Sequence, residues 1–188
     1  KAPEFILHVS RTRGAGRWIQ HVGTSSSNHI LQMGTSQETD YSSYGNIASP
    51  TTTTFGINGI DGIGGESANY VAYVWHGVEG YSKFGVYIGN GNSDGPFIYT
   101  GFRPALYFVK PIDATNSWRQ FDDKRNGFNP DNLSLAWDQA YADDSSYKHD
   151  ILSNGFKIRD SNNATNQSGI TFVYGAWGST PFKYNNTF

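Results

Sequence analysis

Internal repetition is the feature that most constrains the fold of this chain, because segments roughly 100 residues apart resemble one another. The matched pairs are Ala2–Leu7 with Arg103–Phe108, Trp18–Gln20 with Trp118–Gln120, Phe55–Ile57 with Phe156–Ile158, Tyr70–Trp75 with Phe172–Trp177, and Tyr81–Phe84 with Pro181–Tyr184. The offset hardly changes along the chain, so insertions between the copies are small. We interpret the 188 residues as a duplication, with repeats over residues 1–84 and 85–188.

Composition favours strands over helices. The chain holds 22 Gly, 12 Phe, 12 Tyr and 5 Trp, and aromatic residues interrupted by Gly and Asn suit short strands joined by tight turns. Apolar runs lie between turn dipeptides such as Asn90-Gly91, Asn126-Gly127 and Asn154-Gly155. The predicted fold is all-β, an antiparallel β-sandwich of jelly-roll or concanavalin-like type with about twelve strands, and one helical turn is expected at Asp138–Asp144.

One predicted strand is apolar on both of its faces. Leu106 and Phe108 alternate with Tyr107 and Val109, and successive side chains of a strand point to opposite sides of the sheet. We therefore expect this strand to be covered on both faces.

The connection between the repeats bears on domain organisation. Gly77–Tyr81 runs directly into a strand with no Pro-Ser-Gly stretch, which favours one pseudo-symmetric two-sheet sandwich over two separate small barrels. The second repeat opens with a hairpin over residues 84–102, and the first repeat, beginning at Pro3, has no counterpart of it. This difference predicts an unpaired sheet edge that is available for strand addition from another chain.

Charge and cysteine content exclude several classes of function. The chain has no cysteine, so disulfides, thiolate metal sites and iron–sulfur clusters are impossible. Its net charge of −2 comes from dispersed Lys, Arg, Asp and Glu, a pattern that does not favour a nucleic-acid or anionic-membrane partner. No apolar run approaches the roughly 20 residues needed to cross a bilayer. No cofactor is expected.

The sequence offers little to catalysis. Its histidines are scattered, without metal-ligand spacing, and are expected to be solvent-facing or hydrogen-bonded; they are His8, His21, His29, His76 and His149. Glycosidases need two carboxylates near one another, and Glu38 with Asp40 is the one glutamate-containing pair at alternate positions, in a polar, loop-like stretch. We expect no enzymatic activity, and keep glycan hydrolysis as an alternative.

Two groups of residues are candidate ligand-binding sites. Asn90, Asn92 and Asp94 alternate in a Gly-rich loop and form either a hairpin loop capped by Asx side chains or, as the alternative, a calcium loop. No metal is expected, because the loop carries one full charge and no distal Glu. Trp137 and Tyr141 lie in a polar stretch and could stack on a sugar. By contrast, the matched tryptophans (Trp18 with Trp118, Trp75 with Trp177) are expected in the core.

Long strings in the second repeat resemble a known group of proteins. The segments Gly80–Asn92, Asp94–Ala105 and Asp150–Arg159 are similar to a signature of repeat-containing structural proteins of marine tailed bacteriophages. The resemblance implies a concanavalin-like or jelly-roll sandwich on the virion surface, as a receptor-binding tail-fibre domain or a capsid decoration, without catalytic residues. The expected partners are copies of itself, such as a trimer, other virion proteins and host surface glycans. A secreted carbohydrate-binding module is the alternative.

Overall fold

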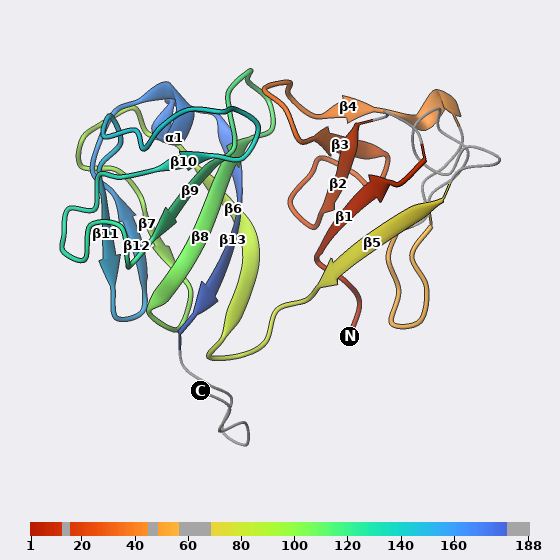
Figure 1. The fold of residues 1–188 in the computed structure, drawn as a ribbon, viewed down its shortest axis with the longest axis horizontal. Coiled ribbons are helices and arrows are strands. Elements are labelled where there is room, and N and C mark those ends of the chain that lie inside the picture. Colours follow the sequence, from red (N-terminus) through yellow and green to blue (C-terminus); the bar gives the residue numbers. More distant parts are fainter. Residues whose placement is uncertain (13–15, 45–48, 57–68, 180–188) are drawn as a thin grey trace.

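The computed structural model describes residues 1–12, 16–44, 49–56 and 69–179 (Figure 1). Strands dominate these ranges, and every strand pair is antiparallel. The helical elements there are the single turns η1 (Ser42–Tyr44) and α1 (Asn163–Asn166), and no described helix is long or apolar enough to cross a membrane. The prediction of an all-β antiparallel fold is confirmed, whereas the helical turn expected at Asp138–Asp144 is wrong, because this stretch forms turns and an isolated bridge.

The N-terminal half of the chain builds one sheet, which we call the first sheet. Its strand order is β4-β3-β2-β1-β5. The strands are β1 (Phe5–Ser10), β2 (Arg17–His21), β3 (His29–Gln32), β4 (Thr39–Asp40) and β5 (Tyr70–Trp75). The short apolar run at Thr53–Ile57 predicts a further strand, which is absent over its described part, residues 53–56. Ile57 and Pro181–Tyr184 lie outside the described residues.

The C-terminal half builds two sheets. The second sheet has the order β10-β9-β8-β13-β6 and the third sheet the order β11-β12-β7. The second sheet contains β6 (Ser82–Ile88), β8 (Pro104–Pro111), β9 (Arg119–Asp122), β10 (Leu135–Ala136) and β13 (Thr171–Gly178). The third contains β7 (Phe97–Tyr99), β11 (His149–Leu152) and β12 (Gly155–Ile158).

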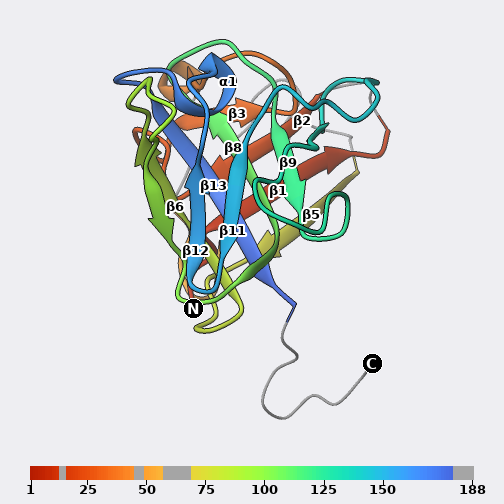
Figure 2. The ribbon, with the colours of Figure 1, turned by 90° about the vertical axis from the view of Figure 1, so that its left-hand side faces the viewer.

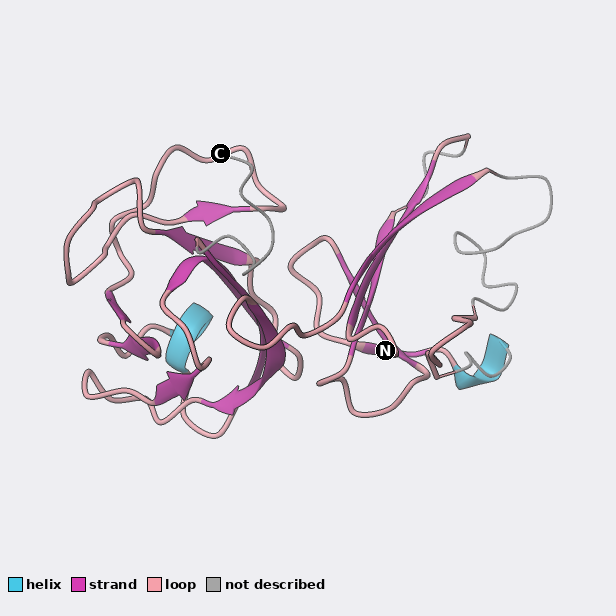
Figure 3. Cartoon of the chain, turned by 90° about the horizontal axis from the view of Figure 1, so that it is seen from below, coloured by secondary structure: helices cyan, strands magenta, loops and turns pink. Residues whose placement is uncertain are grey.

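The three sheets stack with the second sheet in the middle. Figure 2 looks through the stack with the third sheet in front, and Figure 3 shows the first and second sheets face to face. An inner core lies between the first and second sheets and joins Phe5, Ile19, Leu31, Phe84, Phe108, Ile112, Trp118 and Val173. A distal core between the second and third sheets includes Tyr87, Tyr107, Val109, Phe121, Ile151, Phe156, Phe172 and Tyr174.

Alternation along β8 explains why there are three layers rather than the two that were expected. Phe108 belongs to the inner core, and its neighbours Tyr107 and Val109 belong to the distal core. A strand that is apolar on both faces must be covered on both faces. The second sheet is therefore shared between two layers.

The strand pairing does not place Trp18 and Trp118, which the sequence matches, at the same register position. Trp18 of β2 lies opposite His8 of β1, whereas the residue of β9 opposite Val109 of β8 is Arg119. If the match of Ala2–Leu7 with Arg103–Phe108 is continued by one residue, His8 is matched with Val109. The residue matched with Trp18 by strand register is then Arg119 instead of Trp118. Trp118 points into the inner core, while Trp18 is buried on the other face of its sheet, against Tyr41.

Candidate functional site

The predicted loop Asn90–Asp94 is closed by its own side chains. The Asn90 side-chain oxygen accepts from the Asn92 backbone N–H at 2.9 Å, and the Asn92 oxygen accepts from the Asp94 N–H at 3.0 Å. Asn166, which is fully buried, donates from its side-chain amide to the Asn90 side chain and the Asn92 carbonyl. These are Asx turns, in which the side-chain oxygens already serve backbone donors.

The basic side chains of Lys157 and Arg159 lie close to Asp94, the charged residue of this loop. Lys157 Nζ lies 2.8 Å from Asp94 Oδ1, and Arg159 lies at 3.9 Å. The hydrogen bond from Lys157 lowers the pKa of Asp94. Within the described part of the chain, no three His, Asp or Glu side chains are grouped so that they could hold a metal ion.

Trp137 and Tyr141 occupy different environments. Trp137 packs against the inner core, stacked on Trp118 at a centroid distance of 5.8 Å and tilted against Phe108 at 4.8 Å. Its indole N–H donates to the Gln120 side chain at 2.6 Å. Tyr141 is 61% exposed. Trp137 is therefore a half-buried residue at the margin of the inner core, and Tyr141 is the exposed member of the predicted sugar-stacking pair.

The alternating pair Glu38 and Asp40 supports turns. Glu38 accepts hydrogen bonds from the backbone and hydroxyl of Ser25, and Asp40 accepts from the Ser42 backbone N–H at 2.9 Å. These bonds give both carboxylates a structural task in the loops around β3 and β4.

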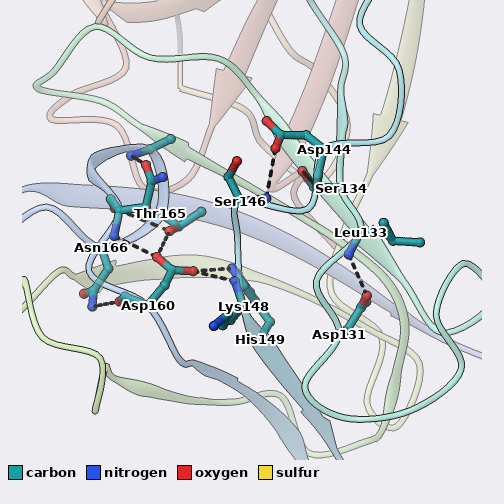
Figure 4. A network of polar contacts seen from close by, with 12 residues as sticks. Asp131, Leu133, Ser134, Asp144, Ser146, Lys148, His149, Asp160, Thr165 and Asn166 are labelled. Atoms are coloured by element: carbon teal, nitrogen blue, oxygen red, sulfur yellow. Dashed lines mark hydrogen bonds and ion pairs between the residues drawn. The ribbon is translucent and has the colours of Figure 1, made fainter.

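A buried polar network surrounds His149, a residue that no pattern in the sequence distinguishes from the other histidines (Figure 4). Tyr107 Oη and His149 Nδ1 are 2.5 Å apart, and the imidazole stacks on Phe121 at 3.8 Å. His149 Nε2 lies 3.9 Å from Asp160, a carboxylate that accepts from the Lys148 backbone N–H and the Thr165 hydroxyl. Burial lowers the pKa of His149 to about 3, so the ring is neutral at physiological pH.

Asp131 and Asp144 tie the long loop after β9 to this network. Asp131 exchanges backbone hydrogen bonds with His149, and its side chain accepts from the Leu133 N–H at 3.2 Å. Burial raises the pKa of Asp131 to about 6. Asp144 exchanges backbone bonds with Ser134 and pairs with Arg119 at 3.3 Å. The titratable groups gathered here hold loops in place.

A cavity of about 470 Å³ lies on the face of the first sheet that points away from the inner core. It is bounded by the N-terminal segment, the ends of β1 and β2, the loop before β3 and residues 49–50. Apolar lining comes from Pro3, Ile6, Val22 and Pro50, and polar lining from Glu4, Gln20, Thr24, Ser26, Ser27 and His29. Sequence reasoning missed this site, because its members are spread over fifty residues with no motif.

Internal hydrogen bonds hold the walls of the cavity. His29 Nδ1 and Ser26 Oγ are 2.8 Å apart, and Gln20 donates to the Gly56 carbonyl at 3.3 Å. His21, at the rear wall, is bound to the Tyr174 carbonyl at 3.1 Å, and burial lowers its pKa to about 4. The neutral His21 ring thus anchors this wall to the second sheet. A cavity of this size with apolar and hydroxylic walls suits a small amphipathic ligand.

Comparison with known proteins gives one match. A family model described as a domain of unknown function, DUF7483, matches residues 1–181. No curated protein and no solved structure matches the chain. Because the family model covers nearly the whole sequence, this chain belongs to the DUF7483 domain family.

Proposed function

We propose that this domain is a non-catalytic glycan-binding module of a structural protein on a bacteriophage surface, in a tail fibre or a capsid decoration. The observation that carries the proposal is the cavity of about 470 Å³ over the first sheet. Its volume lies in the range of small-molecule sites. The resemblance of Gly80–Asn92 and Asp94–Ala105 to marine phage structural proteins supports the virion context.

The lining of the cavity matches the chemistry of a sugar. A pyranose has an apolar face formed by its C–H groups and a rim of hydroxyls that donate and accept hydrogen bonds. Pro3, Val22 and Pro50 offer apolar surface. The carboxylate of Glu4 is an acceptor, whereas the buried Gln20 amide is bonded to the Gly56 carbonyl and to His8 and supports the wall. Hydroxyls of the loop before β3 supply further partners.

We also propose that the first and second sheets derive from duplicated units with jelly-roll-like connections. The orders β3-β2-β1-β5 and β10-β9-β8-β13 support this, since the strands follow one another along the chain in the same way. Ile6 pairs with Val74 and Tyr107 pairs with Ala176, as the matched segments require. The residues after β3 and β10 agree as well: Met33 donates to the Arg17 carbonyl and Trp137 to the Trp118 carbonyl.

Glycan binding is tested by screening the purified domain on an array of bacterial and algal glycans and titrating each hit by calorimetry. We expect affinities in the millimolar to micromolar range, and a loss of at least tenfold on changing Glu4→Gln. Glu79→Gln, the same change at an exposed carboxylate outside the cavity, is the matched control.

Two results would contradict this function. Binding that is unaffected by Glu4→Gln but abolished by Tyr141→Ala would move the site to the predicted aromatic surface. Release of reducing sugar from a bound polysaccharide would make the domain an enzyme instead of a binding module.

A further inference from the structure

β5 is an apolar strand at the edge of the first sheet. Among the described strands its single neighbour is β1. Its sequence, Tyr-Val-Ala-Tyr-Val-Trp, carries no charge, proline or glycine, and Tyr73 and Val74 are 51% and 44% exposed. Edge strands are normally protected by charges, prolines or bulges, and an edge without them is a template for pairing with another chain.

The second sheet shows what fits at this position. β13 pairs with β8 as β5 pairs with β1, and the other edge of β13 is covered by the antiparallel strand β6. Ala176 of β13, which occupies the register position of Val74, is fully buried. Ala176 also belongs to the distal core, so its burial reflects cover by the third sheet as well as pairing with β6. The position beside β5 is therefore shaped for one more antiparallel strand.

β5 is complementary to itself. In an antiparallel pair about a two-fold axis perpendicular to the sheet, the strand centre lies opposite its own copy. If Ala72 is that centre, Tyr73 faces Val71 of the second copy and Val74 faces Tyr70 of the second copy. Each opposed pair then joins an aromatic and a β-branched side chain, which is a favourable combination across strands. The backbone N–H and C=O of Ala72 point away from β1, so the central Ala72 pair can exchange hydrogen bonds across the two-fold axis.

We propose that two copies of this chain pair through β5, antiparallel about Ala72, so that their first sheets form one continuous sheet. The absence of charge on β5 favours a second copy, since like charges would repel across a two-fold axis. A six-residue strand buries less than the roughly 1,000 Å² of a permanent interface. The dimer is accordingly concentration-dependent.

The experiment uses single cysteines, because the chain has none of its own. Opposed Cα atoms in an antiparallel pair are about 4.5–5.5 Å apart, within reach of a disulfide. Ala72→Cys should therefore form a covalent dimer under mild oxidation. Residue 73 of each copy faces residue 71 of the other copy. The two residues 73 are therefore about 8 Å apart, which is beyond the reach of a disulfide. Tyr73→Cys should cross-link several-fold less.

Two controls keep the result interpretable. Phe128→Cys, at a side chain that is 69% exposed and distant in sequence, reports random collision. Sedimentation of the unmodified chain should show a concentration-dependent dimer that Tyr73→Lys shifts to monomer and Phe128→Lys leaves unchanged. A chain that stays monomeric over the whole range overturns the proposal. The proposal is also overturned if Ala72→Cys cross-links no faster than Phe128→Cys. A third contrary result is a monomer that binds a synthetic Tyr81–Ile88 peptide at β5.

Discussion

His21 and His149 are held neutral inside the protein. His21 accepts from the Gly23 N–H at 2.9 Å and is bound to the Tyr174 carbonyl, and His149 is bound to Tyr107. Burial lowers the pKa of His21 to about 4 and that of His149 to about 3. In the unfolded chain both rings have an ordinary pKa near 6.5. These residues link the stability of the fold to pH.

The first prediction concerns the sign of that link at His149. Below pH 6.5 the unfolded chain binds a proton at this ring and the folded chain does not, so stability that is fully present above pH 6.5 is lost as the pH falls toward 3. By pH 4 the loss from this one residue is about 3 kcal/mol. Urea unfolding of the wild type and of His149→Gln between pH 7 and pH 4 measures it, and the variant should show the shallower decline.

His76→Gln, on an exposed histidine, is the matched control and should follow the wild-type curve. Equal pH dependence in wild type and His149→Gln would mean that His149 is protonated in the folded protein, contrary to its burial.

At the scale of elements, β13 depends on a glycine in its centre. A side chain at Gly175 would place its Cβ 2.5 Å from the Phe108 ring and 2.9 Å from the Phe84 ring. We expect Gly175→Ala to destabilise the protein by about 1–3 kcal/mol, the cost of overpacking a core. Chemical denaturation measures the change. Gly34→Ala, where no atom lies within 4 Å of the new Cβ, should change stability by less than about 1 kcal/mol; equal effects would show that the rings move freely.

The sequence predicted elements well where alternation and turn chemistry agreed. Apolar runs between turn residues predict strands at Tyr70–Trp75, Phe97–Tyr99 and Gly155–Ile158, and these are the bounds of β5, β7 and β12. β11 was missed, because His149 and Asp150 look like loop residues until Tyr107 and Phe121 supply partners for the imidazole. Such partners come from distant segments, and periodicity within one strand does not contain them.

The candidate sites were less predictable than the strands. The Asx turns of Asn90–Asp94 follow from local side-chain chemistry, which the sequence carries. The position of Trp137 depends on whether its ring meets Trp118, and the cavity depends on Pro3, Val22 and Pro50 meeting across the first sheet. Both are outcomes of packing between segments that are remote in the chain.

At the scale of the whole molecule, the inner core joins the N-terminal and C-terminal halves of the chain. Phe5 of β1 is 2% exposed and contacts the ring of Phe84 at a centroid distance of 5.8 Å and that of Phe108 at 5.2 Å. Its partners lie in the second sheet, whose other face carries the distal core. Removing the Phe5 ring should therefore also destabilise strands that Phe5 does not contact.

We predict that Phe5→Ala destabilises the protein by about 3–5 kcal/mol, the usual cost of removing a buried phenylalanine, and that the loss is shared by all three sheets. Hydrogen exchange followed by mass spectrometry tests this, because peptides from β2 and from β12 should lose the same protection. Phe128→Ala, at an exposed ring, should leave exchange in both strands unchanged. If Phe5→Ala accelerates exchange in β2 while β12 keeps its wild-type protection, the halves fold separately, and the inner core is a contact between two domains instead of the centre of one.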